Sequence, residues 1–172
     1  QVIPMDHYHH NLRYELPLKP SPNLPNYQSI RLYPSLCLFE GSQISIGRGT
    51  QFPFQVYGHP GYSDSSFSFT PVAIPGMDQN PKHKDQVCGG QDLREISPPK
   101  FTLQYLLQAF SDFEDKQAFF KNYFHLLAGN ETLMAQIQSG LTEDQIRASW
   151  EEDLADYRQS RKSYLLYPES RP

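Results

Sequence analysis

The stretch "FEGSQISIGRGTQFPFQVYGHP", Phe39–Pro60, combines several glycines and prolines with two charged residues. It gathers one glutamate, one arginine, four glycines and two prolines. Glycine permits backbone conformations that other residues avoid, and proline fixes φ, so a shaped loop is predicted here. Two interpretations follow: the loop holds a ligand, or it is an unusually punctuated turn.

Arg48 lies in the middle of this stretch, between Gly47 and Gly49 and before Thr50. Flanking glycines let the backbone approach a ligand closely and present the arginine side chain from a fixed position. The guanidinium offers five donors in a planar fork, which suits a carboxylate, a phosphate or sugar hydroxyls. Arg48 and Thr50 are therefore candidate ligand-binding residues.

Glu40 follows a short apolar run, residues 36–39, that we predict to be a buried strand. It would then stand at a strand end, where it can face a ligand. In the alternative interpretation, Glu40 and Arg48 pair with each other and only hold the loop. Glu40 is the third candidate binding residue.

The chain before this stretch is rich in proline. "LPLKPSPNLPN", residues 16–26, carries four prolines, each of which also restricts the residue before it. We predict an extended, polyproline-like strap on the surface over residues 1–30. The strap contains His7, His9 and His10, but no further ligand at a recognised spacing accompanies them, so a metal site is not expected.

Strands are predicted first along the chain and helices second. Residues 66–76 and 86–96 read as two strands, made irregular or placed at an edge by their Pro and Gly. Beyond residue 100, apolar side chains recur at helical spacing. This order predicts an α+β fold, in which a small mixed or antiparallel sheet packs on about three to four helices.

The predicted helices are bounded by recognisable start and stop residues. They cover residues 103–113, 119–127, 131–139 and a longest helix from 142, and the residues that cap or stop them are Gly129, Asn130, Gly140 and Thr142. The longest helix is expected to bury a face formed by Ile146, Trp150, Leu154 and Tyr157.

Composition limits the class of partner. The 172 residues carry a net charge of −4, and neither nucleic acid nor an anionic membrane is an expected partner, since both require basic patches. No apolar run approaches the length of a membrane span of about 20 residues. Cys37 and Cys88 lack the spacing of a zinc or redox site, so one disulfide or two buried thiols remain open.

The order of several motifs resembles a known family. The sequence resembles the C-terminal half of the exo-acting β-N-acetylmuramidases, glycoside hydrolases of bacterial cell-wall recycling, through "PSPNLP" (20–25), "YPSLCLFEG" (33–41), "SIGRGTQFPFQVYGHP" (45–60), "CGGQDL" (88–93) and "SYLLYP" (163–168). The "SIGRGTQFPF" string, together with the preceding "FEG", is the most specific of these.

This resemblance implies a protein about twice as long, in which a Rossmann-like N-terminal domain precedes an α+β domain. Residues 1–30 would arrive from that N-terminal domain, and residues 31–172 would form the C-terminal domain. The family removes terminal N-acetylmuramic acid from the non-reducing end of peptidoglycan fragments, in a cleft between the domains. The resemblance thus implies saccharide and N-terminal-domain partners, and a periplasmic or secreted location. No cofactor or metal is implied.

For the site, the resemblance implies that Glu40, Arg48 and Thr50 line the substrate cleft. Arg48 is suited to the lactyl carboxylate of muramic acid, and Glu40 to orienting Arg48 or binding sugar hydroxyls. The main catalytic acid is expected in the N-terminal domain, so the catalytic residues stay unknown and the chain alone is expected to be inactive. A non-catalytic carbohydrate- or protein-binding module is the alternative function.

Overall fold

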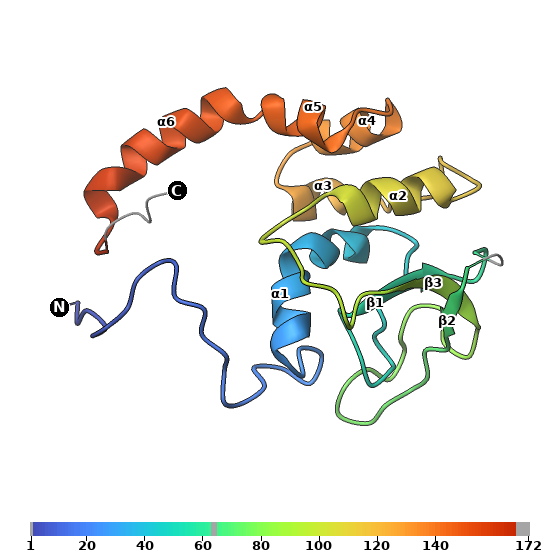
Figure 1. Ribbon diagram of the computed structural model, residues 1–172. Coiled ribbons are helices and arrows are strands. Elements are labelled where there is room, and N and C mark those ends of the chain that lie inside the picture. Colours follow the sequence, from blue (N-terminus) through green and yellow to red (C-terminus); the bar gives the residue numbers. More distant parts are fainter. Residues whose placement is uncertain (1, 63–64, 168–172) are drawn as a thin grey trace. The chain divides into compact units, whose positions relative to one another are not determined.

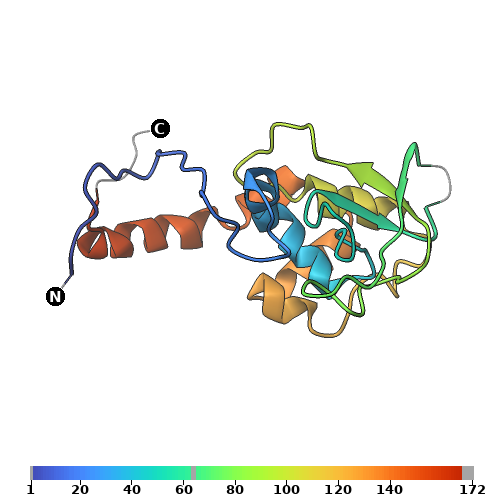
Figure 2. The same ribbon diagram turned by 90° about the horizontal axis from the view of Figure 1, so that it is seen from below.

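The computed structural model describes residues 2–62 and 65–167. These residues form two compact units: a larger one over residues 16–143, and a smaller one that combines the segment before residue 16 with the segment from 144 onward. The larger unit contains the sheet and most of the helices (Figure 1 and, from below, Figure 2).

The larger unit begins with a helix that the sequence analysis did not predict. Helix α1 (Tyr27–Leu36) starts at Asn26, whose side chain accepts a hydrogen bond from the Ser29 amide at 2.9 Å. The Ser29 hydroxyl reaches back to the Asn26 backbone, which completes a capping box. Residues 27–30 of the expected strap are therefore helical. That residues 1–30 connect to a preceding N-terminal domain stays a prediction.

The strand predicted over residues 36–39 is wrong. Helix α1 runs directly into the 3₁₀-helix η1 (Cys37–Gly41), and Leu36, Leu38 and Phe39 are buried on it. A short run of buried apolar residues has no period that separates strand from helix, which explains the error. Glu40 thus lies on a helical turn.

The sheet is antiparallel, with β3 in the middle. Strands β1 (Val56–His59) and β2 (Phe67–Phe69) each pair with β3 (Cys88–Asp92), in the order β1-β3-β2. The two later strands predicted from sequence, over residues 66–76 and 86–96, are confirmed as β2 and β3, each shorter than expected. Strand β1 was missed because glycine and prolines interrupt its segment. A β-carbon on Gly90 would collide with the backbone of β1, so this close pairing requires glycine.

Helices α2 (Gln104–Asp112), α3 (Phe124–Ala128) and α4 (Thr132–Gln138) follow the sheet, and Figure 1 shows α2 above it. The α+β fold is confirmed. Phe119 and Phe120 precede α3 rather than belonging to it, and their rings extend a cluster with Phe110 and Phe124. The predicted helix over 119–127 is therefore shorter than expected.

The residues predicted to end α3 and to begin and end α4 are confirmed. Gly129 and Gly140 adopt left-handed φ values of 74° and 76° at the ends of α3 and α4. The Asn130 side chain accepts hydrogen bonds from the amides of Thr132 (3.1 Å) and Leu133 (2.9 Å), which caps α4.

The predicted longest helix is divided in two. Helix α5 (Glu143–Ala148) ends before Ser149, and α6 (Glu151–Arg161) follows. Ile146 is buried, but Leu154 and Tyr157 are 38% and 60% exposed, so the expected buried face is wrong beyond Ile146. Helix α6 buries none of its residues, because its sequence is mostly polar and Leu154 and Tyr157 are its only large apolar side chains.

The smaller unit brings its two segments together through Tyr167. The Tyr8 and Tyr167 rings lie 4.6 Å apart, and the Met5 amide donates to the Tyr167 hydroxyl at 2.6 Å. None of the helices described is long and apolar enough to cross a membrane. Among the described residues, no cluster of three or more His, Cys, Asp or Glu is arranged to hold a metal ion.

The structure decides between the two alternatives for the cysteines. Cys37 and Cys88 are both free thiols. Cys88 is fully buried beside Val56 and Phe69, and burial raises the pKa of its thiol to about 11. It is therefore a packing residue rather than a nucleophile.

Candidate functional site

The glycine-flanked turn holds Arg48 in a defined position. Gly47 and Gly49 have φ values of 75° and 80°, in the left-handed region that glycine favours. The Thr50 hydroxyl closes the turn: it donates to the Gly47 carbonyl at 2.6 Å and accepts from the Phe52 amide at 3.1 Å. The backbone on both sides of Arg48 is therefore fixed.

Arg48 forms an ion pair with Glu40. A guanidinium nitrogen lies 2.9 Å from Glu40 Oε1, and the two side chains are 37% and 34% exposed. The guanidinium also lies over the Phe54 ring, 5.4 Å from its centroid. An ion pair this exposed adds little stability, so its main effect is to orient the two groups.

Lys82 joins the site from the loop between β2 and β3. Its Nζ donates to the carbonyls of Phe39 (3.2 Å), Ser42 (2.6 Å) and Ile44 (2.8 Å). Burial, followed by the charge of Lys121, lowers the pKa of Lys82 to about 7, and the charge of Glu40 opposes this shift. Lys82 thus holds the chain that follows η1 and places a titratable amine beside the Glu40–Arg48 pair.

These groups surround a pocket of about 240 Å³ within the larger unit, which we call the arginine pocket. Its lining residues are Glu40, Ile44, Ser45, Ile46, Arg48, Asp78, Lys82, Lys121 and Tyr123. The Tyr123 hydroxyl donates to the Glu40 carbonyl at 2.6 Å and so closes the pocket on that side. Three cationic side chains and two carboxylates line it, which suits a ligand that carries both an anionic group and hydroxyls.

The structure brings two of the three predicted site residues together. Glu40 and Arg48 both line the arginine pocket, whereas Thr50 is buried and uses its hydroxyl within the turn. A ligand contact by Thr50 stays a prediction.

Sequence reasoning missed Lys82, Lys121 and Tyr123. Lys82 lies in "MDQNPKHKD", residues 77–85, which reads as an ordinary polar loop. Lys121 and Tyr123 lie within the helix predicted over residues 119–127, in which Tyr123 reads as a packing residue. No local pattern marks these three residues, because only the folded chain brings them to Glu40.

Comparison with known proteins shows the family to which this chain belongs. Residues 31–167 match the family described as exo-β-N-acetylmuramidase NamZ, C-terminal. The peptidoglycan β-N-acetylmuramidase NamZ of Bacillus subtilis is 30% identical, over 96% of this chain and 45% of that protein. A crystal structure of a DUF1343 family protein from Bacteroides fragilis superposes with a TM-score of 0.94 at 42% identity, over 99% of this chain and 49% of that one.

The chain spans about half the length of these relatives. The family match extends from α1 to the end of the described residues, and it includes every residue that lines the arginine pocket. The resemblance inferred from the sequence motifs is confirmed: the chain belongs to the NamZ C-terminal domain family, whose curated relative is a peptidoglycan glycosidase.

Proposed function

We propose that this chain is the substrate-cleft-forming C-terminal domain of a glycosidase that removes terminal N-acetylmuramic acid from the non-reducing end of peptidoglycan fragments. In this proposal, the arginine pocket binds the lactyl carboxylate of the sugar. The observation that carries it is Arg48, held between two left-handed glycines and oriented by Glu40.

The charges of the pocket support an anionic ligand group. The lactyl ether of muramic acid ends in a carboxylate, which N-acetylglucosamine lacks. Arg48 offers two parallel donors to such a carboxylate, and Lys82 and Lys121 add positive charge on the same pocket. Glu40 already accepts from Arg48, so its second role is to accept hydrogen bonds from sugar hydroxyls.

Hydrolysis requires more than this pocket supplies. Glycosidases generally use two carboxyl groups, one on each side of the bond that breaks. Glu40 is engaged by Arg48, and we therefore place the main catalytic acid in the half of the longer relatives that this chain does not cover. The substrate class further supports a cell-envelope or secreted location as part of the proposal.

The proposal is tested by titrating the protein with N-acetylmuramic acid while the amide signals of Gly47 and Gly49 are followed by NMR. We expect saturable shifts at these amides, and Arg48→Ala should weaken binding by about tenfold or more, since a charge-assisted hydrogen bond contributes about 1.5–3 kcal/mol. N-acetylglucosamine should leave these amides unmoved.

A matched control exists in the same unit. Arg94 pairs with Asp92 at 2.5 Å, and its guanidinium lies over Phe52, so Arg94→Ala removes a similar ion pair away from the pocket. Arg94→Ala should bind N-acetylmuramic acid as the unmodified protein does. Equal loss in both variants, or equal shifts by both sugars at Gly47 and Gly49, would refute carboxylate recognition by Arg48.

A further inference from the structure

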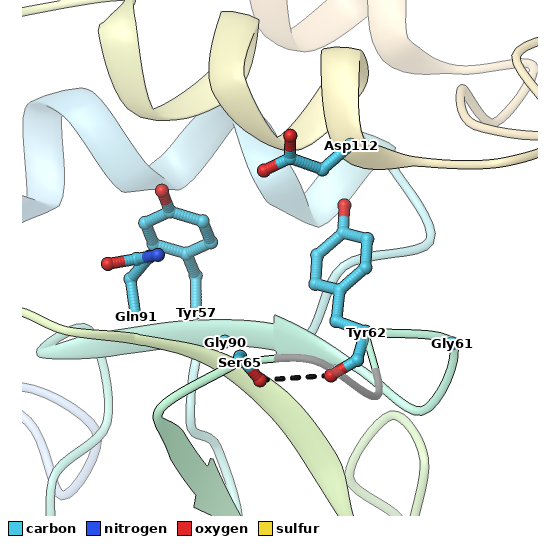
Figure 3. Close-up of a pocket in the computed structure, with 7 residues that line it drawn as sticks. All are labelled: Tyr57, Gly61, Tyr62, Ser65, Gly90, Gln91 and Asp112. Carbon is cyan, nitrogen blue, oxygen red and sulfur yellow. Dashed lines mark hydrogen bonds between the residues drawn. The ribbon is translucent and has the colours of Figure 1, made fainter.

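A second pocket lies in the larger unit, between the β1–β3 side of the sheet and the C-terminal end of α2 (Figure 3). It has a volume of about 340 Å³ and is lined by Tyr57, Gly61, Tyr62, Ser65, Gly90, Gln91 and Asp112. We call it the tyrosine pocket. It shares no lining residue with the arginine pocket.

Tyr57 gives the first indication that this pocket holds a ligand. The residue is only 4% exposed, and its ring stacks on Phe39 with centroids 5.1 Å apart. Its hydroxyl points from the sheet toward α2 in Figure 3, and in the described part of the chain it has no hydrogen-bond partner. The Tyr57 hydroxyl is not one of the buried polar atoms that lack a partner among the described residues, so it opens into the pocket, where a ligand can bond to it.

Tyr62 lines the same pocket, but its hydroxyl has a hydrogen-bond partner within the protein. It stands beside Tyr57 in Figure 3 with the same orientation, and its hydroxyl donates to the Ala109 carbonyl of α2 at 2.6 Å. The two tyrosines therefore differ in whether the hydroxyl already has a hydrogen-bond partner. Tyr62 braces the sheet against α2, whereas the Tyr57 hydroxyl remains available.

Two further polar groups are available beside Tyr57. Gln91 is its cross-strand partner on β3, and its side-chain amide makes no hydrogen bond with the residues that the structure describes. Asp112 lies above both tyrosines in Figure 3; Gln108 donates to one of its carboxylate oxygens at 2.8 Å, and the other accepts nothing from the described residues. The pocket thus presents a hydroxyl, an amide and a carboxylate oxygen.

The protonation state of the two tyrosines favours the donation of hydrogen bonds by their hydroxyls. Burial, followed by the nearby Asp112 charge, raises the pKa of both Tyr57 and Tyr62 above the ordinary value of 10.0. Both phenols therefore stay protonated at neutral pH and can donate hydrogen bonds. A ligand in this pocket must supply an acceptor for Tyr57 and a donor for Asp112.

The charge of the lining excludes anions. Asp112 is the one charged group among the described residues that line the tyrosine pocket, so a carboxylate or phosphate would be repelled. A sugar ring has hydroxyls that both donate and accept, and its apolar C–H groups suit aromatic neighbours. A neutral sugar therefore fits the volume, the charge and the polar groups together.

We propose that the tyrosine pocket is a second carbohydrate-binding site, which takes one neutral N-acetylhexosamine unit through the Tyr57 hydroxyl, the Gln91 amide and the Asp112 carboxylate. The neutral-sugar class rests on the pocket, whereas the choice of an N-acetylhexosamine rests on the proposed function. The two pockets then sort sugar units by charge: the arginine pocket takes the one with a carboxylate, and the tyrosine pocket takes the one without.

The test is an NMR titration of the protein with N-acetylglucosamine, followed at the amides of Gly61, Gly90 and Gln91. We expect saturable shifts there, and Tyr57→Phe, which keeps the ring and its stacking on Phe39, should weaken binding about tenfold. Asp112→Asn should weaken it similarly, because a carboxylate accepts sugar hydroxyls more strongly than an amide does.

Two controls separate this proposal from a general loss of structure and from the proposed function. Tyr105 lies 6.0 Å from the Tyr57 ring but does not line the pocket, so Tyr105→Phe should bind as the unmodified protein does. Arg48→Ala should also leave the shifts at Gly61, Gly90 and Gln91 unchanged, even where it abolishes binding of N-acetylmuramic acid.

Several results would overturn the proposal. These are an absence of saturable shifts at the three amides, an unchanged affinity in Tyr57→Phe, or equal competition there by N-acetylmuramic acid, whose carboxylate the pocket should reject. Tighter binding of a small amine such as putrescine would identify the pocket as a cation site instead. If N-acetylglucosamine does not bind the tyrosine pocket, but the shifts that N-acetylmuramic acid causes at Gly47 and Gly49 still require Arg48, the proposed function remains intact.

Discussion

Lys82 holds the backbone on one side of the arginine pocket. Its amine holds three carbonyls of the segment 39–44, and that segment forms one side of the pocket. We expect Lys82→Met to lower the free energy of unfolding by about 2–4 kcal/mol, because these carbonyls lose their donor. Urea denaturation measures this change.

Lys121 offers the matched control for this prediction. It lines the same pocket, but its side chain makes no hydrogen bond with the described residues. Lys121→Met should change the free energy of unfolding by no more than about 0.5 kcal/mol. Similar effects of the two substitutions would show that the carbonyl contacts of Lys82 contribute nothing to stability.

The charge of Lys82 should also make ligand binding depend on pH. Burial lowers its pKa to about 7, so the side chain is cationic below that pH and neutral above it. The affinity for N-acetylmuramic acid should therefore fall about three- to tenfold as the pH rises through 7. Calorimetric titrations between about pH 6 and 8.5 measure it, and Lys121→Met should keep an inflection but move it to higher pH, because the Lys121 charge lowers the pKa of Lys82. A flat profile would contradict this role of Lys82.

The same shift in pKa fixes the sign of its effect on stability. The folded chain releases the Lys82 proton near pH 7, whereas the unfolded chain keeps it until about 10.5. Between these values the unfolded chain binds more protons, so the Lys82 contribution to the free energy of unfolding rises with pH.

At the scale of elements, the turn around Arg48 and the end of α3 provide a direct comparison. Gly49 and Gly129 both have positive φ, but a β-carbon at Gly49 would lie 2.5 Å from Pro81 Cγ and 2.6 Å from the Val72 carbonyl, whereas Gly129 faces open space. Gly129→Ala should cost about 1–2 kcal/mol of stability from backbone strain alone. Gly49→Ala should cost about 3 kcal/mol or more, since steric overlap is added.

The two alanine variants should differ in binding as well. Gly49→Ala should displace Arg48 and weaken binding of N-acetylmuramic acid, while Gly129→Ala should not affect it. Thermal unfolding and the titration at Gly47 together measure both effects. Equal stability of the two variants would mean that the turn tolerates a side chain, contrary to the packing around Gly49.

The elements that could be predicted from sequence are those specified by local chemistry. Helix α2 follows from its apolar period, and the ends of α3 and α4 follow from Gly129, Asn130 and Gly140. The errors arise where tertiary contacts override local pattern. Residues 36–39 are buried on a helical turn rather than in a strand, and the apolar residues of α6 are not buried.

The same division applies to the site at the scale of the whole molecule. Glu40 and Arg48 lie eight residues apart in one motif, and their pairing was one of the two interpretations that the sequence left open. Lys82 and Tyr123 reach the segment around Glu40 from 43 and 83 residues away. Such contacts depend on the complete fold, and nothing in the local sequence specifies them.

The proposed division of labour between two halves of a longer protein makes a further prediction. These 172 residues by themselves should bind the sugar but show no turnover of a chromogenic N-acetylmuramide, because they span about half the length of their relatives and we place the catalytic acid in the other half. A protein that includes both halves is the positive control. Turnover by this chain alone, abolished by Glu40→Gln, would place the catalytic acid here and refute the division.

The central position of β3 has a consequence for how the chain folds. Strands β1 and β2 precede β3 in sequence, yet neither pairs with the other; both pair with β3. During synthesis from the N-terminus, residues 56–69 must therefore wait until residue 92 has left the ribosome before the sheet can close. Until then both strands expose unpaired backbone, and a chaperone that binds extended apolar segments would find its target between Val56 and Phe69.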